Sequence, residues 1–230
     1  MRLLVEIARQ IRAKTSPNFI IGIKLNSVEF QDGGFNADEA AVVTRALQDV
    51  RVDFVELSGG TLEKIGHEWT KETTQEREAF FLKFAQTIVP QLGSDATHRR
   101  TKVFLTGGLR TIDAMSKALA TVDAIGIARP AAQEPWIARD FLAGKVSGVI
   151  HPLPPFDNDS ALSNGMAGAQ LRQIASGLMP FNSSDETALR IFKGEKAAHD
   201  IAAANDNGKT LPWFLEISTE KVAYNSSGEF

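Results

Sequence analysis

Short apolar runs alternate with amphipathic helical patterns along this chain, and that alternation restricts it to few folds. Four runs are rich in apolar and β-branched side chains, as is typical of strands: 19–25, 52–57, 102–106 and 122–127. A helical pattern follows each run, and another precedes the first. Because strict β-α repetition with short turns gives parallel strands and right-handed crossovers, the sequence predicts a parallel α/β sheet.

Polar residues predict where the helices begin. Asn36 with Glu39, and Thr73 with Glu76, have the spacing of a capping box, in which each side chain accepts a hydrogen bond from the other's backbone. Thr111 predicts a further helix start. The first apolar run, 19–25, is almost uninterrupted, which predicts a strand buried on both faces.

Composition excludes several classes of protein. The chain has 230 residues and a net charge of −3, so we expect no nucleic-acid partner. It has no cysteine, which excludes disulfides and thiol chemistry, and its four histidines lie too far apart to predict a metal site. No apolar run approaches the roughly 20 residues of a membrane span. The first residues lack the layout of a signal peptide, so we expect a cytoplasmic protein with no membrane partner.

The character of the sequence changes after Gly144. Residues 151–155 are proline-rich and predict a rigid linker, and residues 160–205 have only a weak helical pattern. We therefore expect two regions: residues 1–150, with the alternating elements, and residues 151–230, a linker with a mostly helical or irregular extension and tail.

Two strand ends have the composition of an anion site. In parallel α/β folds, ligands bind beyond the carboxyl ends of the strands. The run at 102–106 is followed by Gly107, Gly108 and Arg110, and the run at 122–127 is followed by Ala128 and Arg129. Glycine lets backbone N–H groups approach an anion closely. One such pair is more often an ordinary turn, but two of them, each with an arginine, favour a phosphate site.

Several motifs resemble one family. Gly22-Ile23-Lys24-Leu25-Asn26-Ser27 is similar to the fifth strand of the NADH:flavin oxidoreductase, or Old Yellow Enzyme, family of fungi and bacteria. Val55-Glu56-Leu57-Ser58-Gly59-Gly60-Thr61 resembles its sixth strand. Leu105-Thr106-Gly107-Gly108-Leu109-Arg110-Thr111 and Ile125-Gly126-Ile127-Ala128-Arg129-Pro130 resemble strands seven and eight. The resemblance covers about residues 1–145. It implies part of a TIM-type (βα)8 barrel, namely strands five to eight with their helices.

The resemblance also implies roles for individual residues in binding FMN. Lys24 matches the basic residue beside the flavin ring. A cation there stabilises negative charge on the reduced flavin. Gly107, Gly108 and Ala128 would contact the FMN phosphate through their backbones, and Arg129 would pair with it as a planar fork. Arg110 is as well explained as a loop residue.

The implied activity is an FMN-dependent oxidoreductase that takes hydride from NAD(P)H and passes it to an activated alkene. The family's substrate-clamping pair and proton-donating tyrosine come from four earlier strands, so no catalytic residue is assigned here. Only His67 and the single tyrosine, Tyr224, are candidates for a substitute, and the chain alone is expected to have little activity. Two alternatives are a non-catalytic half-barrel that acts as an interaction subunit or binds a phosphorylated ligand, and a flavin-free barrel lyase or isomerase.

Four strands of a barrel leave two edges open. The runs at 20–25 and 122–127 would be these edges, and neither has a proline or lysine in its middle to protect it. We therefore expect a homo-oligomer, a partner chain that completes the barrel, or a tail from Ser160 onward that folds over the open side.

Overall fold

The computed structural model describes residues 2–26, 36–58, 82–83, 85–93, 99–206 and 210–224. The chain divides into two compact units. The first comprises Met1–Ile65 and Lys71–Ile127, and the second comprises Gly66–Thr70 and Ala128–Phe230. Each unit has its own hydrophobic core.

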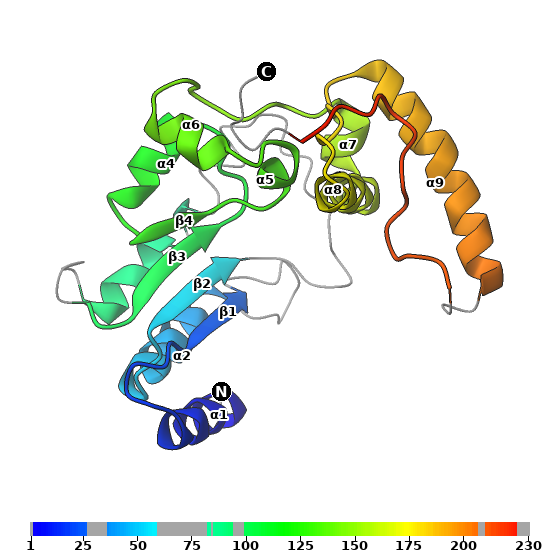
Figure 1. Ribbon diagram of the computed structural model, residues 1–230. Coiled ribbons are helices and arrows are strands. Elements are labelled where there is room, and N and C mark those ends of the chain that lie inside the picture. Colours follow the sequence, from blue (N-terminus) through cyan, green and yellow to red (C-terminus); the bar gives the residue numbers. More distant parts are fainter. Residues whose placement is uncertain are drawn as a thin grey trace. The chain divides into compact units, whose positions relative to one another are not determined.

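The first unit is built on a parallel sheet with the strand order β1-β2-β3-β4 (Figure 1). Its strands are β1 (Gly22–Asn26), β2 (Phe54–Ser58), β3 (Lys102–Thr106) and β4 (Ala124–Gly126). All three pairings are parallel. This confirms the predicted α/β class and is compatible with part of a barrel, because sequential parallel strands are neighbours in such folds.

One helix precedes β1 and others follow the strands, as the pattern predicts. They are α1 (Arg2–Lys14), α2 (Ala37–Asp49), the 3-10 helix η1 (Val89–Leu92) and α4 (Ile112–Leu119). Asn36 and Glu39 form the predicted capping box at the start of α2. Thr111 accepts a hydrogen bond from the backbone N–H of Ala114 and so begins α4. Thr73 and Glu76 lie outside the described residues.

The two faces of the sheet have different environments. One face is fully buried, with Val55, Leu57, Val103 and Leu105 at its centre. Side chains of α1, α2, η1 and α4 share this core. The alternate residues of β2 and β3 are only half-buried, as the period of two along a strand requires. On this second face the rings of Phe54 and Phe104 stack with their centroids 4.7 Å apart.

The expectation that residues 19–25 form a strand buried on both faces is wrong. The strand begins only at Gly22, and the side chains of Phe19 and Ile20 are exposed. The physical reason is topology: β1 lies at an edge of the described sheet and pairs only with β2. The strand β1 has the apolar composition of a central parallel strand, but its position at an edge leaves only its residues Ile23 and Leu25 packed against the core.

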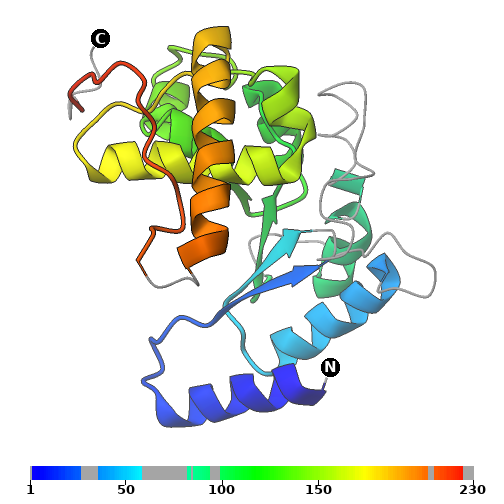
Figure 2. The ribbon, with the colours of Figure 1, turned by 90° about the vertical axis from the view of Figure 1, so that its right-hand side faces the viewer.

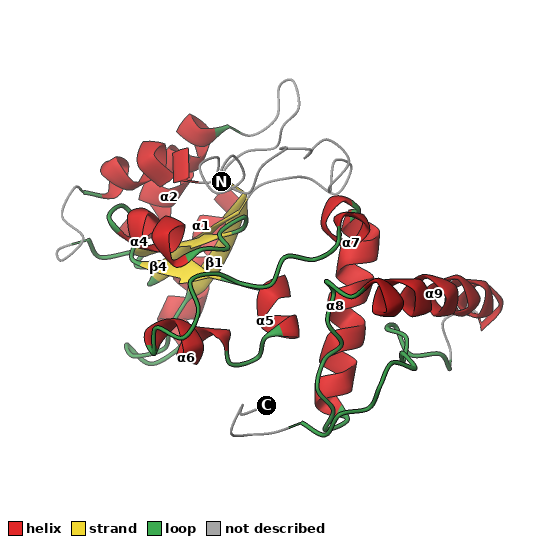
Figure 3. Ribbon diagram, turned by 90° about the horizontal axis from the view of Figure 1, so that it is seen from above, coloured by secondary structure: helices red, strands yellow, loops and turns green. Residues whose placement is uncertain are grey.

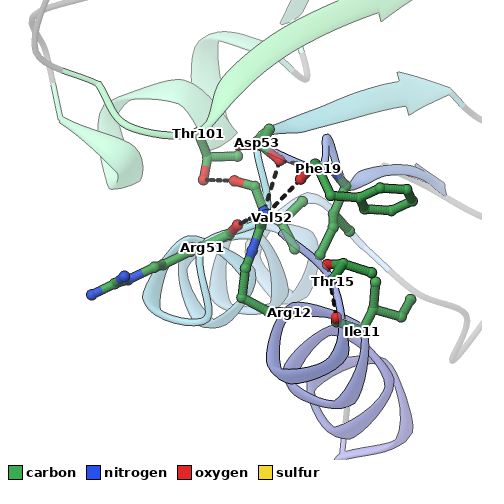
Figure 4. A network of polar contacts seen from close by, with 9 residues as sticks. Ile11, Arg12, Thr15, Phe19, Arg51, Val52, Asp53 and Thr101 are labelled. Carbon is green, nitrogen blue, oxygen red and sulfur yellow. Dashed lines mark hydrogen bonds and ion pairs between the residues drawn. The ribbon is translucent and has the colours of Figure 1, made fainter. Parts of the chain in front are cut away.

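A polar network joins α1 to the starts of β1 and β2 (Figure 4). The guanidinium of Arg12 donates to the carbonyl of Phe19 at 2.5 Å and to the carbonyl of Arg51 at 2.6 Å. It also donates to the Asp53 carboxylate at 2.8 Å, and Asp53 accepts from the backbone N–H of Ile21 at 2.7 Å. Arg12 on α1 therefore holds the segments that lead into β1 and β2.

The second unit is helical. It contains α5 (Arg129–Gln133), α6 (Ile137–Leu142), α7 (Pro154–Asn158), α8 (Ser160–Ala175) and α9 (Glu186–Asp206). The long helix α9 crosses α8, as two views show (Figures 2 and 3). Their core is formed by buried side chains far apart in sequence: Phe156, Met166, Phe181, Phe192, Leu215 and Ile217. Residues 160–205 are thus more regularly helical than their weak pattern predicts. None of the described helices is long and apolar enough to cross a membrane.

Candidate functional site

The carboxyl ends of the four strands define the edge where a ligand is expected. Because every pair is parallel, β1, β2, β3 and β4 all end at the same edge of the sheet. The loops that follow β1 and β2, including His67, lie outside the described residues. The loop after β3 and the residues that follow β4 are described in full.

The turn after β3 has a backbone that suits glycine. Gly107 has a φ of 120° and Gly108 a φ of 74°, a region that other residues adopt only with strain. Leu109 is buried and anchors the loop to the core, and Thr111 then caps α4. The two glycines are therefore required by the turn itself. Without a Cβ they also leave the backbone accessible to an anion, the property on which the phosphate prediction depends.

Ala128 and Arg129 lie in the second unit. Ala128 precedes α5, and its carbonyl accepts from the backbone N–H of Ala131 at 3.0 Å. The Arg129 guanidinium is hydrogen-bonded to the hydroxyl of Ser163 on α8. Gly107 and Gly108 belong to the first unit, so the convergence of all four residues on one phosphate stays a prediction.

Lys24 projects from β1 near the carboxyl edge, and its charge has a partner. Its ammonium lies 2.8 Å from the carboxylate of Glu56, the residue opposite it on β2. Glu56 also accepts a hydrogen bond from the Thr106 hydroxyl on β3. The hydrogen bond from Lys24 holds the pKa of Glu56 below its usual value, with Thr106 adding to this effect. Lys24, Glu56 and Thr106 thus form a polar row across three strands.

The backbone of β4 lies close to the Thr106 side chain of this row. A Cβ at Gly126 would lie 2.0 Å from the Oγ1 atom of Thr106, its register partner on the neighbouring strand. Glycine on β4 therefore gives the Thr106 side chain its space beside Glu56. Sequence reasoning identified Lys24 but not Glu56 or Thr106. The only sequence signal was an acid between two apolar residues, Val55 and Leu57, which the structure shows to be buried.

Tyr224 is another residue that the sequence offered as a candidate. Tyr224 lies in the second unit, where its ring stacks on Trp136 with centroids 4.7 Å apart. Among the residues that the structure describes, no cluster of histidine, cysteine and carboxylate side chains could hold a metal ion. The described chemistry of the edge is therefore a glycine turn and a charge-compensated lysine.

Sequence comparison identifies the relatives of this chain. It is 41% identical over 191 residues to the NADH-dependent flavin oxidoreductase nadA of Aspergillus parasiticus, a match that covers 82% of this chain and 41% of that protein. It is 37% identical over 149 residues to the NADH-dependent flavin oxidoreductase iccE of Talaromyces variabilis, covering 60% of this chain and 34% of that protein. The chain belongs to the family of these fungal flavin oxidoreductases.

The family assignment rests on these relatives, because no protein-family profile matches the chain. A third relative, the NADH-dependent flavin oxidoreductase iliE of a Neonectria species, is 33% identical over 149 residues, which are 60% of this chain and 18% of that protein. The chain thus spans less than half the length of the curated flavin oxidoreductases that it matches.

Proposed function

We propose that this chain is the FMN-phosphate-binding part, strands five to eight, of an Old Yellow Enzyme-type oxidoreductase. The observation that carries the proposal is the 41% identity over 191 residues to a relative named as an NADH-dependent flavin oxidoreductase. The parallel sheet and the glycine turn at its carboxyl edge support it, because barrels bind phosphate at the loops after strands seven and eight. Since the relatives are named for NADH, we propose NADH as the reductant.

The residues present fit a flavin phosphate in their chemistry. Gly107 and Gly108 have the positive φ of a glycine turn and carry no Cβ. We propose that Ala128 adds backbone contact while Arg129 supplies a guanidinium that can pair with two phosphate oxygens. A hydrogen bond between the Arg129 guanidinium and the Ser163 hydroxyl holds the side chain in place. FMN, when bound, supplies the hydride chemistry, which transfers hydride from NADH to an activated alkene.

The role proposed for Lys24 is electrostatic. A cation beside the flavin ring favours the reduced, negatively charged form of the cofactor. In this structure Glu56 balances the charge of Lys24 and fixes its position. Glu56 is therefore a positioning residue in the proposal, and it moderates the electrostatic effect of the lysine.

The test is a titration of the purified chain with FMN and with riboflavin, which lacks the phosphate. We expect Arg129→Ala to weaken FMN binding by about 1.5–3 kcal/mol, the contribution of a charged hydrogen bond, and to leave riboflavin binding unchanged. Arg190→Ala is the matched control, since Arg190 is an exposed arginine of the same unit on α9. An Arg129→Ala variant that binds FMN as tightly as the wild type would refute the phosphate assignment.

The same titration separates the alternatives. A chain that binds FMN and inorganic phosphate competitively but has no affinity for riboflavin would favour a site for other phosphorylated ligands. A chain that binds neither flavin would contradict the proposed cofactor. Hydride transfer to an activated alkene is then measured with NADH in the FMN-loaded chain, because binding alone does not establish the activity.

We also propose that further strands pair with the sheet. Among the described strands, β1 pairs only with β2 and β4 only with β3. Both edge strands are short and largely apolar, and unpaired apolar edges favour association. The extra strands would come from a second copy or from a separate chain. Light scattering after size exclusion tests this proposal, and a stable monomer that keeps a cooperative unfolding transition would contradict it.

A further inference from the structure

The second unit contains a cavity of about 750 Å³ that has no part in the proposed flavin site. Its volume lies within the range of roughly 300–1,000 Å³ that is usual for small-molecule sites. The wall comes from α5, α6, the start of α9 and the irregular segments around residues 145–150, 179–185 and 219–222. Its apolar part includes Trp136, Ile137, Ile150, Phe181 and Ile191.

The charged side chains of the wall are predominantly acidic. Among the described lining residues, carboxylates come from Glu134, Asp140, Asp185 and Glu220, and a single cation comes from Lys145. Asp140 has cationic neighbours, because it lies 3.1 Å from the Arg139 guanidinium and 3.9 Å from the Lys145 ammonium.

The surroundings of two other carboxylates, Asp185 and Glu220, account for their charges. Asp185 accepts from the backbone N–H of Thr187 at 2.7 Å and so holds the first turn of α9. Glu220 is exposed to solvent, which screens its charge. Neither residue needs a ligand to account for its place in the fold.

Glu134 is different from these three. One of its oxygens accepts from the backbone N–H of Ile150 at 2.7 Å, and the side chain is half-buried. No ion pair joins Glu134 to any cation in the part of the chain that the structure describes. Burial raises the pKa of Glu134, and the negative charge of Asp140 adds to that effect. A partly desolvated carboxylate without a counter-charge is unfavourable, so a cation entering the cavity would relieve that cost.

We propose that this cavity binds an amphipathic organic amine. The ammonium of the ligand pairs with the Glu134 carboxylate, and its apolar body lies against the side chains of Ile137, Phe181 and Ile191. Charge complementarity excludes an organic anion as the preferred ligand, and the apolar wall excludes a bare metal cation. The proposal does not rest on flavin binding, because the cavity wall contains none of the residues assigned to FMN.

The first test compares three probes of equal shape on the wild-type chain by calorimetry: phenylbutylamine, phenylbutanol and phenylbutyrate. We expect the amine to bind at least about tenfold more tightly than the alcohol, as one charged hydrogen bond requires, and the carboxylate to bind weakest. Equal affinity for amine and alcohol would overturn the proposal, as would the absence of amine binding at millimolar concentration.

The second test locates the amine by backbone amide NMR. The amide of Ile150 should shift on titration, because it donates to Glu134, and the indole N–H of Trp136 should shift because it lines the cavity. Amine-dependent shifts confined to other parts of the chain would overturn the assignment. This readout needs no variant, so it stands even if a substitution prevents folding.

The third test removes the carboxylate. Glu134→Gln should reduce amine affinity by about tenfold or more and leave phenylbutanol binding unchanged. Glu186→Gln is the matched control, because Glu186 is an exposed glutamate of the same unit outside the cavity wall. If both variants bind the amine as the wild type does, Glu134 is not the anchor and the proposal fails.

Discussion

Loss of the Arg12 side-chain charge should weaken the first unit. Arg12→Met keeps an apolar stem of similar length but deletes the guanidinium and its bonds to the carbonyls of Phe19 and Arg51 and to the Asp53 carboxylate (Figure 4). The side chain of Arg12 is 18% exposed and that of Asp53 47%. Phe19 and Arg51 are exposed as well, so water reaches part of all three bonds.

The expected change in the free energy of unfolding follows from these environments. Hydrogen bonds from a charged donor contribute about 1.5–3 kcal/mol each when well shielded, whereas an exposed ion pair contributes under about 1 kcal/mol. Water can reach the vacated carbonyls in part, and bonds within one network are not additive. We therefore expect Arg12→Met to lower the free energy of unfolding by about 1–3 kcal/mol, below the sum for three well-shielded bonds.

Urea denaturation followed by circular dichroism measures this difference. The matched control is Arg2→Met on the same helix. Arg2 pairs only with Glu6 in the described residues, and its side chain is 90% exposed. That substitution should cost less than about 0.5 kcal/mol. If Arg12→Met costs no more than Arg2→Met with unchanged denaturant slopes, the network does not hold α1 to the sheet and the reasoning is refuted.

Three further results are expected. Burial alone would raise the pKa of Asp53, but hydrogen bonds from Ile21 and Arg12 lower it from its ordinary value of 3.8. The wild type should therefore be more stable than Asp53→Asn by its full margin above that pH, and the margin should decline as the pH falls below it. Urea titrations at several pH values measure this difference. For Glu134 the sign is opposite. Its pKa is raised, so the wild type should lose stability relative to Glu134→Gln as the pH rises above 4.5, and a rising advantage would contradict this. Gly126→Ala should destabilise the chain by about 1–3 kcal/mol because of Thr106, whereas Gly194→Ala, in open space on α9, should stabilise it by about 0.5–1 kcal/mol in the same thermal melts.

The sequence predicts local features of the fold well because their causes are local. The capping box of Asn36 and Glu39 and the cap at Thr111 need only a few neighbouring residues, and both are present. The burial of residues 19–25 could not be predicted from the sequence in the same way. An apolar run indicates a strand, but whether both its faces are covered depends on which strands lie beside it, and β1 has a described neighbour on one side only.

The candidate site shows the same division between local and long-range causes. Gly107 and Gly108 are recognisable because a turn with positive φ requires glycine. Glu56 was missed because its pairing with Lys24 depends on the register between two strands. In the second unit, α8 has a weak pattern because small residues take part in its packing: Gly168 leaves room for the ring of Phe214, which is distant in sequence. A periodicity argument cannot include a partner that distant.

The contacts between β1 and β2 restrict how the lengths of these two strands can change during evolution. The bond from Ile21 to Asp53 and the pair of Lys24 with Glu56 tie the strands at two points, which lie three residues apart on each strand. Inserting or deleting one residue between the ties on β1 alone would break one of them and move the polar row to the apolar face. Length changes in this part of the chain should therefore occur in both strands together or be confined to the loops.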